Sequence, residues 1–498
     1  MEGPVVRRTI KRNEDVTLDQ SQPQTNPFTH SISLSTYDKI KIFVLSIVLL
    51  LPRVIGVAIC LVTSYWLACI GLLGLSEEEL KSKPMQGWRR TLRAIISQIM
   101  VWLFYCSGFN KVKVKGRQAT AREAPILALA SHSTFYDALV VVFLGSPSIV
   151  AKEEVKKVPF FGKLINFTQP IYVEREDPNS RANTIKEMVR RATSEDPWQQ
   201  ILIFPEGTCS NRKALITFKP GAFYPGVAVQ PVCIKYPNRL DTLSWTWDGP
   251  GAMKILWYTM TQFVTYAEIE FLPPYVPSEE EIRDPKIFAE NVRLEMAKCL
   301  EVPVVNYSFE DCRLMLKATK LGLPSEVGLI GAANLKTKYG FDQKELETTI
   351  LESFAKIADK KDGVIRQEGL ASYLEIPVNN PCLMQVFKAY DQDCKGFISF
   401  KKFIVGRMSV SLPAITEQNL EATFELLDRG KKGYINLEDV TYALEKSFAG
   451  STSSLKLPLF GVKEDSKITY GDFASTVNEK PEYAKFFEIF RQSYAPAS

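Results

Sequence analysis

Histidine is one of the residue types that this chain has least of. Its 498 residues include only two, His30 in a polar N-terminal stretch and His132. The nine cysteines are scattered and form no Cys-x-x-Cys pair, which argues against a disulfide framework and favours reducing surroundings or burial in a membrane. The net charge of +5 is mild and no basic block stands out, so the sequence gives no indication of a nucleic-acid partner.

The N-terminus also lacks the pattern of a cleavable signal peptide, because its first apolar stretch begins too late. Residues 1–36 form a polar tail that the composition predicts to be disordered. Residues 37–109 are predicted to be a membrane anchor followed by an interfacial helix. The anchor has two open geometries, a single span over 54–75 or a hairpin that bends near the Pro-Arg pair at 52–53. The stretch 95–109 fits an interfacial helix or a helix that covers the domain that follows it.

From residue 110 to 300 the pattern alternates short apolar runs with helical stretches, which predicts an α/β sheet covered by helices. A helix is predicted to begin at Ser180, with one apolar stripe. The runs predicted to be strands are 126–130, 148–151, 171–173, 201–204, 228–236 and 267–272.

The rest of the chain is predicted to be an all-α, EF-hand-like domain over 346–498, joined by a helical linker over 301–345. Its evidence is a four-fold repeat in which an isoleucine is followed five residues later by another apolar anchor. Paired EF-hands have this rhythm, because position eight of each loop joins a short sheet between the two loops. The repeated pairs are Ile365 with Leu370, Ile398 with Phe403, Ile435 with Val440, and Ile468 with Phe473.

The loops of this repeat are poor calcium ligands. An EF-hand needs oxygen ligands at positions one, three and five and a bidentate Glu at twelve. The best loop keeps Asp391 and Asp393 but has Lys395 at position five and Lys402 at position twelve. The next loop begins at Asp428 and has Gly430, Lys432 and Asp439, and the loops near 358 and 461 are poorer still. Calcium binding is therefore predicted to be weak or absent.

The candidate catalytic residues lie in Ser-His-Ser-Thr-Phe-Tyr-Asp at 131–137, directly after the apolar run 126–130. A neutral imidazole can take a proton from a hydroxyl near neutral pH, and a carboxylate on its other nitrogen orients it and stabilises the cation. On a regular helix a spacing of five would separate the side chains of His132 and Asp137. We therefore predict a strand-to-helix turn that brings them together.

This His-x-x-x-x-Asp block resembles the first motif of the glycerophospholipid acyltransferase family. Three further blocks resemble the family's other motifs in the same order. They are 155–162 leading into 171–175, Phe-Pro-Glu-Gly-Thr-Cys-Ser-Asn at 204–211, and Val-Gln-Pro-Val at 229–232. Four ordered motifs make the resemblance specific, and it covers residues 110–240. The Glu-Gly-Thr-Cys wording, together with the C-terminal repeat, is most similar to lysophosphatidylcholine acyltransferases.

The resemblance implies a membrane-bound enzyme that moves an acyl or acetyl group from a coenzyme A thioester to the free hydroxyl of a lysophospholipid. It implies His132 as general base and Asp137 as its orienting acid, with no acyl-enzyme, bound cofactor or metal. Arg175 would bind phosphate as a bidentate fork, and Lys219 would add a second cation. Pro231 would line the acyl chain, although core packing explains it equally well.

The Glu-Gly-Thr turn is the remaining candidate for substrate binding. Glu206, Gly207 and Thr208 would hold the acceptor or the developing oxyanion through amides and the Thr208 hydroxyl. Relatives that acylate phosphate monoesters often carry a basic residue at the next position, where this chain has Cys209. One fewer cation fits a phosphocholine diester, and lysophosphatidylcholine is therefore the expected acceptor.

Two other functions remain open at this stage. The same motifs also serve acylation of lysophosphatidic acid or glycerol-3-phosphate. A non-enzymatic membrane scaffold, with the repeats as its working part, would have no need for His132 in its motif. The expected location is the endoplasmic reticulum membrane, with Golgi membranes or lipid droplets as alternatives, and the catalytic domain is expected to face the cytosol, where acyl-coenzyme A is made.

Overall fold

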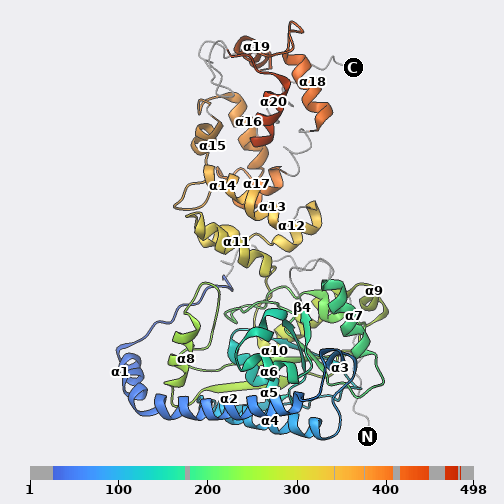
Figure 1. Ribbon diagram of the computed structural model, residues 1–498. Coiled ribbons are helices and arrows are strands. Elements are labelled where there is room, and N and C mark those ends of the chain that lie inside the picture. Colours follow the sequence, from blue (N-terminus) through green and yellow to red (C-terminus); the bar gives the residue numbers. More distant parts are fainter. Residues whose placement is uncertain are drawn as a thin grey trace. The chain divides into compact units, whose positions relative to one another are not determined.

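A computed structural model describes most of the chain (Figure 1). It divides into two compact units, residues 1–309 and 310–498. The domain boundaries that the sequence suggests at 300 and 345 remain predictions. The described residues are 26–173, 180–340, 343–374, 376–407, 416–447, 466–480 and 483.

The first unit is built around one seven-stranded sheet with the order β1-β7-β6-β2-β5-β3-β4. Its strands are β1 (Lys111–Lys115), β2 (Ile126–Ala130), β3 (Ser148–Lys152), β4 (Ile171–Val173), β5 (Ile201–Ile203), β6 (Val229–Lys235) and β7 (Tyr266–Phe271). Neighbouring strands are parallel except β6 and β7, which are antiparallel. This mixed sheet confirms the predicted α/β architecture.

Different helices cover the two faces of the sheet. The helices of this unit are α1 (Thr36–Leu45), α2 (Leu51–Leu72), α3 (Glu77–Ser82), α4 (Trp88–Cys106), α5 (Ala138–Phe143), α6 (Phe161–Phe167), α7 (Ser180–Ala192), α8 (Ala252–Met260), α9 (Glu279–Arg283) and α10 (Pro285–Leu300). In β2 alternate side chains point to opposite faces. Leu127 and Leu129 pack in one core cluster with α4, α5 and α8, whereas Ile126 and Ala128 pack in another with α7 and α10. Strand β2 is therefore buried on both sides.

The apolar N-terminal stretch is one continuous helical run, Thr36–Leu72, which includes a π-helical turn at Ser46–Leu50. Among the described residues it is the one helix long and apolar enough to cross a membrane. The π-helical turn lies directly before Pro52, whose missing N–H interrupts the regular hydrogen-bond pattern. The helix nevertheless continues, and the Nη1 of Arg53 donates to the carbonyl of Met260 at 2.8 Å. The hairpin with a bend at 52–53 is therefore wrong.

Helix α2 lies beside α4 along one side of this unit (Figure 1). Its inner face carries small residues, among them Ala68 and Gly71, and a Cβ at Gly71 would collide with the Phe167 ring. Its outer face exposes large apolar side chains, including Ile59 and Trp66. Helix α4 has the same two-sided character, so the stretch 95–109 both covers the sheet and exposes aromatic side chains.

Residues 26–35 pack onto the first unit ahead of α1. Phe28 is fully buried, and the backbone N–H of His30 donates to the carbonyl of Asp248 at 2.9 Å. The Asn211 amide donates to the carbonyls of Asn26 and Thr29 at 2.8 and 2.9 Å. The expectation of disorder over 1–36 is therefore wrong for residues 26–36, and residues 1–25 lie outside the described part.

In the described residues of the second unit the regular elements are helices. They are α11 (Phe309–Lys320), α12 (Ala332–Tyr339), α13 (Gln343–Glu345), α14 (Leu351–Ile357), α15 (Gln367–Leu374), α16 (Pro381–Tyr390), α17 (Phe400–Gly406), α18 (Glu417–Leu427), α19 (Leu437–Ser447) and α20 (Tyr470–Glu479). Ile365 pairs with Ile398, and Ile435 with Ile468, each through an antiparallel bridge. The repeat predicts this pairing. The loop near 461 lies outside the described residues.

Replacing Phe28 with Ala should destabilise the first unit, because a buried Phe-to-Ala change typically costs about 3–5 kcal/mol. The melting temperature of the detergent-solubilised full chain measures this. Phe43→Ala is the matched control, since Phe43 is 67% exposed on α1. Equal melting temperatures for the two variants would contradict the packing of residues 26–35.

Candidate active site

The candidate site lies where three neighbouring strands end. Strands β6, β2 and β5 are adjacent and parallel, so their carboxyl ends meet at one edge of the sheet. His132 follows β2, Glu206 follows β5 and Tyr236 follows β6. The sheet order therefore brings together three segments that are far apart in the sequence.

His132 and Asp137 meet across the turn that the sequence predicts. Residues Phe135–Asp137 form a short 3-10 turn, and the imidazole Nδ1 lies 2.8 Å from Asp137 Oδ2. The same oxygen accepts the backbone N–H groups of Ser133 at 2.8 Å and Thr134 at 3.1 Å. A proton held on Nδ1 leaves Nε2 unprotonated, which is the form that a general base needs.

The other side of the His132 ring faces Cys209. The thiol Sγ lies 3.5 Å from Nε2, and the ring stacks on Phe204 with a centroid distance of 4.2 Å. The side chain is 24% exposed, so the ring is accessible from solvent. Burial lowers the pKa of His132, but the charges and hydrogen bonds of Cys209 and Asp137 raise it. Together these effects place the pKa well above the ordinary value of histidine. A reaction that uses this base should therefore become faster as pH rises.

Glu206 supports the backbone of His132. Its Oε1 accepts the His132 backbone N–H at 2.5 Å, and its side chain is fully buried. Burial raises the pKa of Glu206 to about 8, so the neutral acid predominates at neutral pH. The Glu206 carboxyl group therefore holds the backbone of His132, and the expected role of this turn's amides in substrate binding stays a prediction.

Gly207 and Thr208 form the turn after β5. Gly207 has a φ of +67°, and its N–H donates to the Phe204 carbonyl at 3.1 Å. A Cβ at Gly207 would lie 3.0 Å from Lys219 Cε, so Lys219 passes directly over this turn. The Thr208 hydroxyl accepts the Trp247 indole N–H at 2.8 Å. The structure therefore brings Gly207, Thr208 and Lys219 together, with the Gly207 amide already engaged inside the turn.

One further candidate from the sequence lies inside the sheet, and another lies outside the described residues. Pro231 is buried within β6 opposite Ala128 of β2, and its carbonyl accepts the Leu272 N–H at 3.0 Å. Core packing accounts for the burial of Pro231, and its contact with an acyl chain stays a prediction. Arg175 lies outside the described residues.

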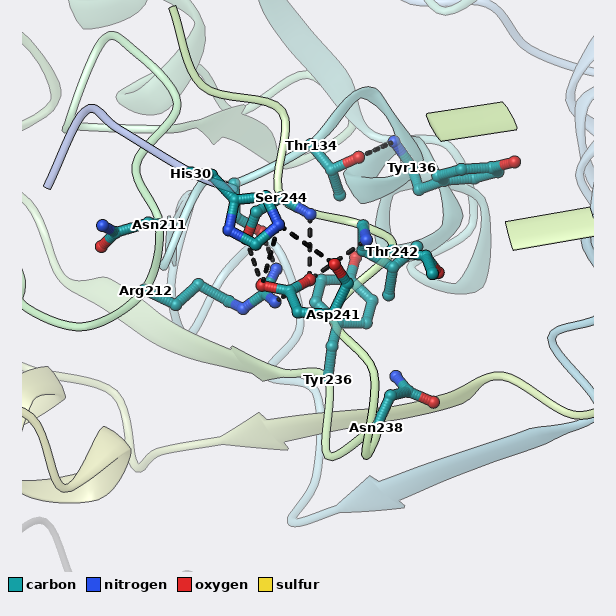
Figure 2. A network of polar contacts seen from close by, with 12 residues as sticks. His30, Thr134, Tyr136, Asn211, Arg212, Tyr236, Asn238, Asp241, Thr242 and Ser244 are labelled. Carbon is teal, nitrogen blue, oxygen red and sulfur yellow. Dashed lines mark hydrogen bonds and ion pairs between the residues drawn. The ribbon is translucent and has the colours of Figure 1, made fainter. Parts of the chain in front are cut away.

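Two site residues that the sequence did not reveal are Tyr236 and Arg212 (Figure 2). The Tyr236 hydroxyl donates to Asp137 Oδ1 at 2.6 Å. Arg212 donates to the Ser133 hydroxyl at 2.8 Å and pairs with Asp241 at 2.7 Å. Only their positions in the sequence could have indicated these two residues. Tyr236 ends a predicted strand, and Arg212 closely follows the Glu-Gly-Thr block.

Comparisons with known proteins identify the family of this chain. A family model described as Acyltransferase matches residues 111–235. The lysophosphatidylcholine acyltransferase of Drosophila melanogaster is 44% identical, over 79% of this chain and 73% of that protein. Lysophosphatidylcholine acyltransferase 2 of Danio rerio is 42% identical, over 93% of this chain and 88% of that protein. The chain belongs to the lysophosphatidylcholine acyltransferase family.

The predicted family and enzyme class are thereby confirmed, since the chain is an acyltransferase. Among solved structures, the 1-acyl-sn-glycerophosphate acyltransferase PlsC of Thermotoga maritima aligns with a TM-score of 0.35 at 17% identity. That alignment covers 54% of this chain and 99% of PlsC.

Glu206→Gln should keep activity within a few-fold of wild type, because a neutral amide oxygen can still accept the His132 N–H. Glu206→Ala should lose about 10–100-fold, since it leaves a buried donor without a partner. Turnover of labelled acyl-coenzyme A at matched expression measures both. If the Gln variant lost as much activity as the Ala variant, a neutral supporting role would be excluded.

Proposed function

We propose that this acyltransferase moves an acyl group from a coenzyme A thioester to the free hydroxyl of a lysophospholipid, with lysophosphatidylcholine as the main acceptor. The supporting observation is the pair of His132 and Asp137, at 2.8 Å, with the Nε2 side of the ring accessible. Relatives named lysophosphatidylcholine acyltransferases match most of the chain at 42–44% identity. Cys209, in place of a basic residue, supports a diester acceptor.

The proposed mechanism is direct transfer with general-base catalysis. The acceptor oxygen attacks the thioester carbonyl while His132 Nε2 takes its proton, and Asp137 stabilises the imidazolium. The tetrahedral oxyanion then collapses, the C–S bond breaks, and the imidazolium returns the proton to the coenzyme A thiolate. Lys219 beside the Gly207 turn supplies positive charge for phosphate, and Arg175 is proposed as a second phosphate ligand. The donor is a long-chain acyl or an acetyl thioester.

We also propose that the exposed apolar side of α1 and α2 contacts the bilayer. Its large side chains recur at helical spacing, as at Ile40, Phe43, Ile47, Leu51 and Ile55. A lysophospholipid could then reach the site from the membrane. The proposed setting is the endoplasmic reticulum membrane, with the catalytic unit on the cytosolic side.

The assay that tests this function follows labelled acyl-coenzyme A with a panel of lysolipids and thioesters. His132→Ala should lower turnover by about 10²–10⁴-fold, the usual contribution of a general base. Asp137→Asn should also be severe, because an amide cannot stabilise the imidazolium. The double variant should lose little more than either single variant, since the two residues act as a unit.

Three outcomes would refute parts of this assignment. If His132→Ala kept more than about a tenth of wild-type activity, the general-base mechanism would fail. A preference for lysophosphatidic acid or glycerol-3-phosphate would refute the acceptor. If no thioester and lysolipid pair reacted, the scaffold alternative would stand.

We propose that the second unit is an EF-hand-like domain in which lysine takes the place of calcium. The Lys402 ammonium donates to Asp391 Oδ1 at 2.6 Å and to the Phe397 carbonyl at 2.9 Å, and it pairs with Asp393. These oxygens occupy loop positions one, seven and three, where calcium would bind. In the next loop the Lys432 ammonium pairs with Asp439 at 2.7 Å.

Calcium at about 0.1 mM should therefore leave the melting temperature of the full chain unchanged, because both loops already hold an internal cation. Lys395→Asp together with Lys402→Glu should create a calcium-dependent rise in melting temperature. Lys401→Glu is the matched control, an exposed neighbour that changes charge without supplying a ligand. Micromolar calcium affinity in the wild-type chain would contradict the substitution of lysine for calcium.

A further inference from the structure

We infer that Tyr236 is a positioning residue for the catalytic pair and acts through Asp137. This inference rests on the proposed role of His132 as the general base. The Asp137 side chain is 1% exposed, so its carboxylate must obtain its hydrogen bonds from the protein. One carboxylate oxygen, Oδ2, accepts from the imidazole and from two backbone N–H groups of its own motif.

The second oxygen of Asp137 depends on Tyr236. Its Oδ1 accepts the phenol O–H at 2.6 Å, and Tyr236 lies 99 positions further along the chain, just after β6. A hydrogen bond from a neutral hydroxyl to a carboxylate is among the stronger kinds in proteins. This bond fixes the plane of the carboxylate and thereby the direction in which Oδ2 presents itself to His132.

The phenol stays a donor across the working pH range. Burial and the neighbouring Asp137 raise the pKa of Tyr236 well above its ordinary value, so the O–H remains protonated. Among the described residues, the other charged or titratable groups near Asp137 and His132 are Glu206 at the His132 backbone, Cys209 at the His132 Nε2, and Arg212 over the Tyr236 ring. These three groups are unchanged when only the phenol oxygen is removed.

Arg212 holds the ring of Tyr236 in place (Figure 2). Its guanidinium lies 5.3 Å from the ring centroid, donates to the Ser133 hydroxyl, and pairs with Asp241. Burial opposes ionisation of Asp241, but Arg212 and the Ser244 hydroxyl lower its pKa to about 2, so its charge persists. The His30 ring donates to the Asp241 carbonyl at 3.0 Å, which connects the N-terminal segment to the same cluster.

Removing the phenol oxygen has a defined effect on pH dependence. Without this donor the negative charge of Asp137 is less well stabilised. The pair of His132 and Asp137 therefore binds a proton more tightly. The base must lose that proton before it can act. The acid limb of the kcat/KM profile should therefore move to higher pH, by about one unit, the size expected for one charge-assisted hydrogen bond.

The experiment compares Tyr236→Phe with wild type in membranes, using acyl-coenzyme A and lysophosphatidylcholine across pH. The expected result is a limb shifted upward, a kcat about tenfold lower, and a KM that changes little. Tyr275→Phe is the matched control, because it removes a phenol-to-carboxyl hydrogen bond of 2.7 Å to Glu281 away from the site. Its pH profile should equal that of wild type.

Two further variants keep the inference testable if Tyr236→Phe folds poorly. Fluorotyrosine incorporated at position 236 keeps the ring and strengthens the donor, so the limb should move to lower pH. In an Asp137→Asn background, Tyr236→Phe should cost much less than in wild type, because both act through one carboxylate. An unshifted limb with fluorotyrosine, or full additivity with Asp137→Asn, would overturn the inference.

Failure of the proposed function has a different signature. Wild-type membranes would then transfer no acyl group, or His132→Ala would remain active. An active wild type with an inactive His132→Ala, together with a Tyr236→Phe profile that matches Tyr275→Phe, would overturn the role of Tyr236 alone.

Discussion

A buried carboxylate is the constraint on which the site depends. Asp137 is almost completely removed from water, and an ionised carboxyl group is costly there unless donors surround it. Its own motif supplies three donors and the end of β6 supplies the fourth. Strand β6 lies beside β2 in the sheet, so the strand order places the Tyr236 donor next to Asp137. This donor helps to stabilise the buried negative charge that faces His132.

A second buried carboxyl group, on the other side of β2, is accommodated differently. Glu206 has the His132 backbone N–H as its close donor, and burial raises its pKa to about 8. The neutral form can therefore persist at neutral pH without the ring of donors that Asp137 has. The two acids have different roles. Asp137 places a negative charge beside the imidazole, and Glu206 holds the backbone of His132. Glu206 follows β5, and Tyr236, which donates to Asp137, follows β6.

How much could be read from the sequence depends on the range of the contact. The turn between His132 and Asp137 follows from a spacing that works only if the chain bends, and the isoleucine pairs follow from a regular repeat. The sequence did not predict the role of Tyr236, because its partner Asp137 lies 99 positions away and no local pattern connects the two residues. The N-terminal segment looked disordered because a single buried Phe28 is hidden among polar residues. Strand β1 was absent from the predicted strands because its Lys-Val alternation at the sheet edge offers little apolar signal.

The role of Lys402 could not be decided from the sequence alone. The sequence shows a cation where calcium needs an oxygen ligand, which predicts only that calcium binding is weak or absent. The geometry adds that the Lys402 ammonium contacts Asp391, Asp393 and the Phe397 carbonyl, so a positive charge in this loop comes from the chain itself. A loop that binds a metal reversibly responds to the metal concentration. The Lys402 ammonium is part of the chain and cannot dissociate. Asp137 in the first unit and Asp391 in the second are both buried, and each accepts hydrogen bonds from its own motif and from one side chain further along the chain.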